Sequence, residues 1–179
     1  MLRHRGLAAL GAGLLIAVGA WPLVRPKQTS GAVERPSAPG WDRAHEKVFL
    51  AEQLRRNPKH TPVLLRLAQI ERQDGDLGGA RRHLEEAVAA DGSQADIRLE
   101  LSLVCSELGD LAVAEEQNRE VLRLAPGQPD ALYNLGAIAA NRGDVLHARQ
   151  YWLSVVGSGR NSDVTAKSLA GIQRLQAAQ

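Results

Sequence analysis

The sequence predicts an all-α protein, an α-solenoid of three helical hairpins with flanking helices, behind one N-terminal transmembrane or signal helix. Three observations lead to this fold class. The dipeptide Gly-Asp recurs every 34 residues, at positions 75, 109 and 143. Hydrophobic residues make up 44% of the 179 residues but aromatic residues only 3%, and the abundant Ala and Leu favour closely packed helices. A long uncharged apolar stretch lies near the N-terminus.

Residues 1–24 resemble a membrane-targeting element. Basic residues flank the uncharged stretch Gly6–Val24 on both sides. As a helix, these 19 residues would span about 28 Å, enough to cross the hydrocarbon core of a bilayer. We therefore expect either a signal anchor or a signal peptide, cleaved after the small residues Val18, Gly19 and Ala20.

The charge on the N-terminal flank predicts the topology. Basic residues before an apolar segment hold that end in the cytoplasm. We expect a single-pass protein of the bacterial inner membrane with its repeats in the periplasm, or, alternatively, a protein exported after signal cleavage. The following residues 25–40 are rich in Pro and predict a flexible linker.

The basic character of the chain comes from its N-terminal part. The net charge is +2 overall, but residues 1–40 hold five Lys or Arg and one Glu, so the chain from Trp41 onward has a net charge of −2. A folded region without excess positive charge does not predict nucleic-acid binding.

The Gly-Asp pairs define the repeat. Each pair lies between two amphipathic stretches, where Gly can end one helix and Asp can cap the next. The spacing predicts hairpins at 61–94, 95–128 and 129–162, an N-terminal flanking helix within 41–60 and a C-terminal capping helix within 163–179. Other positions recur in the same phase: Leu67, Leu101 and Leu135, and Ala80, Ala114 and Ala148.

This pattern resembles the tetratricopeptide repeat (TPR) family, whose signature combines large, small and aromatic residues at fixed offsets. The third copy matches best, through Leu135-Gly136, Ala148 and Trp152, whereas the second departs at the packing positions Arg98 and Asn118. The resemblance implies that stacked hairpins bury one another's apolar faces. It also implies that the protein binds a protein or peptide partner.

In the TPR family, the first helix of each hairpin lines a groove that binds the partner. Carried onto this sequence, the predicted groove residues are Leu65, Gln69, Arg72, Leu99, Leu103, Ser106, Tyr133, Ala137, Ala140, Lys167 and Arg174. Leu99, Leu103 and Tyr133 would form its apolar centre, flanked by positive charge. Alternatively, the terminal helix covers that centre. Leu65 and Gln69 replace the Lys-Asn pair with which some members hold a carboxylate, so no carboxylate clamp is expected.

The sequence contains no motif for catalysis or metal binding. It has no HExxH pair, phosphate loop or Cys pair, and its one Cys, Cys105, is expected to be a buried helix residue. We therefore expect no enzyme activity, cofactor, metal or small-molecule substrate.

The predicted function is that of a membrane-tethered scaffold that binds a peptide or helix segment of a partner during assembly of an envelope complex. The layout is similar to membrane-anchored periplasmic TPR assembly factors such as cytochrome c maturation helpers. The alternative is a permanent structural subunit of a membrane complex, with its groove filled by a neighbouring subunit.

Overall fold

The computed structural model describes residues 42–159 and 163–177. The predicted targeting segment and linker, residues 1–40, lie outside the described residues. No helix within the described ranges combines the length and the apolar character that a bilayer crossing requires. The described residues form eight α-helices: α1 (Arg43–Arg56), α2 (Thr61–Gln73), α3 (Leu77–Ala90), α4 (Ala95–Glu107), α5 (Leu111–Leu124), α6 (Pro129–Asn141), α7 (Val145–Gly157) and α8 (Asp163–Ala177).

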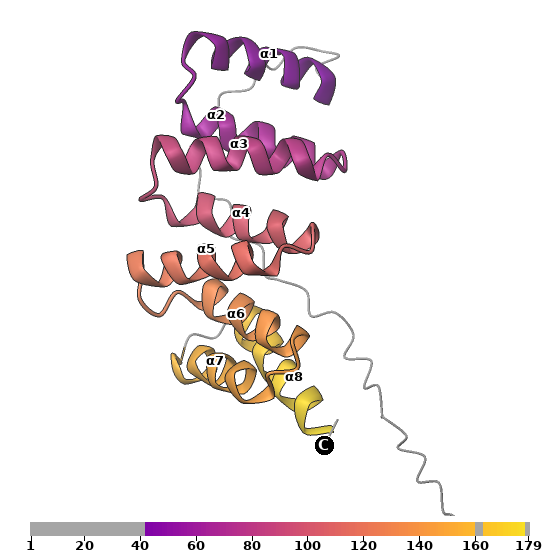
Figure 1. Ribbon diagram of the computed structural model, residues 1–179, viewed down its shortest axis with the longest axis vertical. Helices are drawn as coiled ribbons and strands as arrows, with labels where there is room; N and C mark the ends of the chain where they lie inside the picture. Colours follow the sequence, from indigo (N-terminus) through magenta and orange to yellow (C-terminus); the bar gives the residue numbers. More distant parts are fainter. Residues whose placement is uncertain (1–41, 160–162, 178–179) are drawn as a thin grey trace, which may run out of the picture.

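The helices form an array of hairpins, as the repeat predicts. Helices α2 and α3, α4 and α5, and α6 and α7 form the three hairpins, and each helix packs against the next one in the chain. Helix α8 contacts both α7 and α6. Figure 1 shows the resulting stack, with α1 at one end and α7 and α8 at the other.

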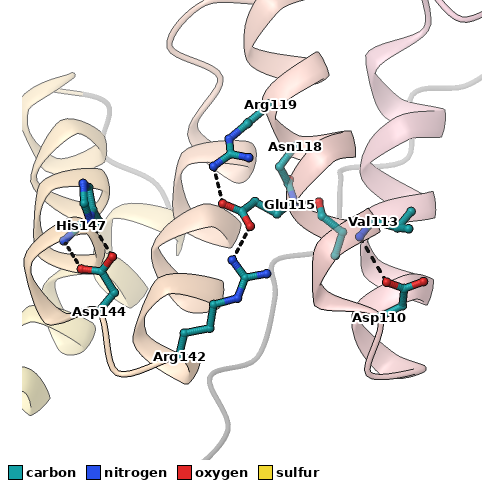
Figure 2. A network of polar contacts seen from close by, with 9 residues as sticks. Asp110, Val113, Glu115, Asn118, Arg119, Arg142, Asp144 and His147 are labelled. Carbon is teal, nitrogen blue, oxygen red and sulfur yellow. Dashed lines mark hydrogen bonds and ion pairs between the residues drawn. The ribbon is translucent and has the colours of Figure 1, made fainter.

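The turns inside the hairpins follow the predicted chemistry. The glycine of each turn has a positive φ, 86° at Gly75, 82° at Gly109 and 78° at Gly143, a region that side chains disfavour. The next residue caps the following helix: Asp76 Oδ1 accepts a hydrogen bond from the Gly79 backbone N–H at 2.8 Å. Figure 2 shows the equivalent caps at Asp110 and Asp144.

The two helices of each hairpin approach through complementary side-chain sizes. Ala68 on α2 and Leu84 on α3 share one apolar cluster. In the third hairpin, Gly136 on α6 faces Trp152 on α7, and a methyl group on Gly136 would lie 2.6 Å from the indole Cδ1. The smallest residue is therefore matched to the largest.

The second hairpin uses a polar pair at the same place, which explains the departure at Asn118. Its side chain is fully buried, and its Nδ2 donates hydrogen bonds to Ser102 Oγ and, at 2.8 Å, to the Ala114 carbonyl. Its Oδ1 accepts a hydrogen bond from Asn134 Nδ2 at 3.4 Å. Buried polar groups are tolerated when they are paired in this way, so Asn118 links α5 to both α4 and α6.

Arg98, the other departure, also has partners. Its Nε donates to the Gly92 carbonyl at 2.8 Å, and its Nη1 donates to Gln117 Oε1 at 2.7 Å. The guanidinium therefore joins the α3–α4 turn to α5, and a bond to a backbone carbonyl replaces the apolar contact that the repeat signature would have made.

Candidate partner-binding face

The predicted apolar centre of the groove is buried inside the array. Leu99, Leu103 and Tyr133 are only 2%, 4% and 3% exposed. Leu99 belongs to a cluster with Val121 and Ala131, which joins the second hairpin to the third. These side chains therefore stabilise the stack, and they leave little apolar surface for a partner.

The terminal helix accounts for the burial of the third-copy residues. Tyr133, Ala137 and Ala140 share one apolar cluster with Trp152 and with three residues of α8, Val164, Ile172 and Leu175. The centroids of the Tyr133 and Trp152 rings lie 6.1 Å apart. Burial raises the pKa of Tyr133, and the positive charge of Arg174 opposes that rise. The alternative of a covering terminal helix therefore applies to Tyr133, whereas Leu99 lies in a different cluster.

The remaining predicted groove residues keep accessible surface. Leu65, Gln69 and Ser106 are half-buried, and Lys167 and Arg174 are exposed. Lys167 Nζ lies 2.5 Å from Asp163 Oδ2, one helical turn away. Partner binding by the predicted set stays a prediction, and the accessible members offer the surface on which it can be tested.

Arg72 differs from the free positive charge that the sequence suggested. Its side chain is 9% exposed. Its guanidinium donates to both carboxylate oxygens of Glu107, at distances from 2.8 to 3.1 Å, and lies 4.0 Å from Glu100. This bidentate pair connects the ends of two successive first helices, α2 and α4, and neutralises the charge of Arg72 within the face.

A further ion-pair network connects the second and third hairpins. The Glu115 carboxylate on α5 accepts hydrogen bonds from Arg119 on the same helix and from Arg142 at the end of α6 (Figure 2). Because these side chains are partly exposed, their contribution to stability is expected to be small.

Helix α1 carries an apolar surface that was not predicted from the sequence. Val48 is 72% exposed, and two open hollows of about 490 Å³ lie beside it. One is lined by Lys47, Val48, Ala51, Leu54, Arg55, Leu67, Glu71 and His83. The other is lined by Ala44, His45, Val48, Phe49 and Glu52. The 34-residue register could have predicted this surface, because the positions that correspond to Val48 in the other second helices hold the polar residues Arg82, Glu116 and Gln150.

The described residues offer little chemistry beyond packing and ion pairing. Within 42–159 and 163–177, no three His, Cys, Asp or Glu side chains come together as metal ligands would. His83 Nδ1 and Glu71 Oε2 lie 2.7 Å apart and join α3 to α2. Cys105 is fully buried, as predicted, and burial raises the pKa of its thiol to about 11, which disfavours the reactive thiolate.

Comparison with known proteins supports the repeat assignment. Residues 65–129 and 106–162 match the tetratricopeptide repeat family model, and together they span more than half of the chain. No curated protein matches the sequence.

Several solved structures share the fold. MamA has 15% identity and a TM-score of 0.61, with 76% of this chain and 88% of that chain covered. A TPR protein from Parabacteroides merdae has 19% identity and a TM-score of 0.68, covering 76% and 54%. YrrB, described as a TPR protein with an unusual peptide-binding site, has 18% identity and a TM-score of 0.62, covering 75% and 66%. At these identities the likeness shows the fold alone. The family-model match and the observed hairpins together show that the chain belongs to the TPR family, a family of typically non-catalytic protein-interaction scaffolds.

Proposed function

We propose that this protein is a membrane-tethered scaffold that binds a segment of a partner protein on its first-helix face, during assembly of an envelope complex. Membership of the TPR family supports the scaffold role. The tether rests on the sequence of Gly6–Val24, and the similarity to cytochrome c maturation helpers rests on the layout of the sequence alone.

The proposed location of the binding site rests on the bidentate contact between Arg72 and Glu107, which joins the first helices α2 and α4. Leu65, Gln69 and Arg72 follow one another at helical spacing along one side of α2, and Ser106 is the neighbour of Glu107 on α4. The accessible face therefore combines a partly exposed apolar side chain with amide and hydroxyl groups, beside an Arg72–Glu107 pair whose charges neutralise each other. Such a face suits a segment that offers both backbone hydrogen-bonding groups and a small apolar side chain.

Site-specific photo-cross-linking in the native membrane tests this face. A photoreactive residue at Gln69 or Ser106 should give one discrete adduct, whereas matched controls at Glu86 and Glu116, exposed on second helices, should give none. An Arg substitution at Leu65, combined with the probe at Ser106, should abolish the adduct without changing the helical content. Adducts of equal yield at all four positions would contradict the proposal.

The buried members of the predicted groove are unsuitable for this test. Substitution of Leu99, Leu103 or Tyr133 by Ser would remove core contacts and change stability, so lost binding would report on folding. Co-purification without irradiation distinguishes the two roles: after salt washing, a partner that stays bound in stoichiometric amount indicates a permanent subunit, and one that is released indicates an assembly scaffold.

A reporter fusion tests the tether. An enzyme that is active only outside the cytoplasm, fused after Gly40, should be active if the repeats are exported. The mass of the mature chain then separates the anchor from the cleaved signal, because cleavage after Ala20 removes the first 20 residues. An inactive fusion would overturn the proposed location.

A further inference from the structure

Helix α1 ends the array with an exposed apolar surface, the α1 surface, formed by Ala44, Val48, Phe49 and Ala51. Val48 is 72% exposed, more than any other large hydrophobic residue in the described ranges. Ala44 and Ala51 are exposed as well, and Phe49 is half-buried. The spacing of 44, 48 and 51 places these residues on one side of the helix.

The repeat register shows that an apolar residue at the position of Val48 is unusual among the second helices. Helices α1, α3, α5 and α7 begin 34 residues apart. In the last three, the position of Val48 is taken by Arg82, Glu116 and Gln150, which are all exposed. The outer face of a terminal repeat is ordinarily polar, so the exposed Val48 on this terminal helix predicts that something covers it.

The α1 surface offers both an exposed side chain and open hollows beside it, as a self-complementary patch needs. Val48 projects between two open hollows of about 490 Å³, so a second α1 could insert its own Val48 beside the first. A two-fold interface requires this property, because the same patch serves both partners. The small side chains of Ala44 and Ala51 allow two helix axes to approach closely.

The charges on α1 favour an antiparallel pair. The helix has Asp42 at its N-cap and Arg55 and Arg56 in its last turn, and His45 and Glu52 line one hollow together. Antiparallel pairing centred between Val48 and Phe49 places Asp42 opposite Arg55 of the second copy, and His45 opposite Glu52. It also places opposite ends of the helix dipoles side by side. Parallel pairing would instead oppose Arg55 to Arg55.

The ion pairs that Glu52 and Asp42 make within α1 do not prevent this exchange. Glu52 lies 3.2 Å from Arg55 and 3.1 Å from Arg56, and Asp42 lies 2.9 Å from His45 Nδ1. These are exposed contacts within one helix, and such contacts contribute little to stability. We propose that the α1 surface binds the α1 surface of a second copy of this chain, in antiparallel orientation around a two-fold axis near Val48. This inference is independent of the proposed partner-binding face.

Disulfide cross-linking of the full-length chain in its membrane tests the pairing. A helix-to-helix contact is small compared with stable interfaces, so a covalent trap suits it better than size measurement. In Val48→Cys, two thiols near the axis should be oxidised to a disulfide by copper phenanthroline. Wild type is the first control, because its one thiol, Cys105, is fully buried. Leu153→Cys, at an exposed position of α7, is the matched second control and has the same tether.

The proposal expects a disulfide-linked dimer of Val48→Cys, with wild type and Leu153→Cys staying monomeric. A monomeric Val48→Cys, a cross-link to a different protein, or equal dimer yields from Val48→Cys and Leu153→Cys would each overturn it. A monomer is the result expected if residues 1–41 of the same chain cover the surface.

A charge swap tests the orientation. In the Val48→Cys background, His45→Glu places like charges opposite each other at two symmetric contacts and should lower the dimer yield about fivefold. Adding Glu52→Lys should restore it. If the double variant stays as low as His45→Glu alone, the antiparallel arrangement is wrong. Circular dichroism of each variant verifies that the helices are retained.

Discussion

Gly136 on α6 lies directly against the indole of Trp152 on α7, so closely that a Cβ at residue 136 would come within 2.6 Å of Cδ1. The indole is fully buried, and its Nε1 donates a hydrogen bond to the Tyr133 carbonyl at 3.1 Å. The other side of the ring meets Gly171 of α8, whose Cβ would lie 2.7 Å from Cζ3. Glycines on two neighbouring helices therefore make room for the ring.

Gly136→Ala should destabilise the array. Insertion of a methyl group against the fixed indole should lower the free energy of unfolding by about 1–3 kcal/mol, and Gly171→Ala should do the same. Urea denaturation followed by circular dichroism measures both changes. Gly157→Ala is the matched control, because a Cβ there meets nothing within 4 Å, so Ala should be neutral or slightly stabilising. Equal stabilities for Gly136→Ala and Gly157→Ala would show that the indole contact does not exclude a side chain.

Asn118→Ala should cost about 2–4 kcal/mol, because it removes buried volume and leaves Ser102 without its Asn118 partner. The double variant Ser102→Ala with Asn118→Leu reproduces the Ala68 and Leu84 pair of the first hairpin and should regain part of the loss, because the contact with Asn134 is not restored. Thermal unfolding of Ser102→Ala, Asn118→Leu and the double variant measures the coupling between the two positions. A double variant no more stable than Asn118→Ala would refute the equivalence of the two hairpins.

The stability of the array should fall at acidic pH in part through Asp144. Its carboxylate accepts a hydrogen bond from the His147 backbone N–H at 3.2 Å and lies 2.6 Å from His147 Nδ1. The backbone bond, followed by the side-chain bond, holds the pKa of Asp144 below its ordinary value of 3.8. Because the folded-state pKa is the lower one, the stabilisation is present above the unfolded-state pKa. It is lost as the pH falls through the folded-state pKa.

Asp144→Asn keeps a cap acceptor that does not ionise, so its Tm should fall less than that of wild type between about pH 5 and pH 2. Thermal melts at a series of pH values test this, with Asp163→Asn as a control that leaves all the hairpin caps intact. Parallel Tm profiles for wild type and Asp144→Asn would rule out a contribution from this cap.

Cys105 should react very slowly in the folded chain. Burial raises its thiol pKa to about 11, which lowers the thiolate fraction at pH 8 by roughly a hundredfold relative to an ordinary cysteine. Iodoacetamide labelling followed by mass spectrometry should therefore be slow in buffer and rapid in urea. Equally fast labelling in both would mean that α4 opens readily or that the thiol is accessible.

The sequence predicted the hairpins well because their boundaries depend on local rules. Gly75 adopts a positive φ, and Asp76 caps the first turn of the next helix. Both requirements act within a few residues of the chain. The 34-residue phase then transfers the same prediction to the other two hairpins.

The accessibility of the candidate site was less predictable, because it depends on neighbouring helices. Tyr133 is buried because α8 packs beside it, and Gly171 lets that helix approach the indole of Trp152. Arg72 loses its free charge to Glu107, 35 residues away. The family offsets identify the side of a helix on which a residue lies, but the exposed area depends on the sizes of side chains in the adjacent repeat.

The enclosed position of Trp152 gives the C-terminal end of the array an optical reporter. Trp21 and Trp41 are the other tryptophans of the chain, so replacing both with Phe leaves emission that comes from the contact region of α6, α7 and α8. Circular dichroism, by contrast, sums over all the helices. The denaturation midpoint from tryptophan emission can then be compared with the midpoint from circular dichroism. The difference would measure how independently the C-terminal end unfolds, since nearest-neighbour coupling sets the cooperativity of such arrays.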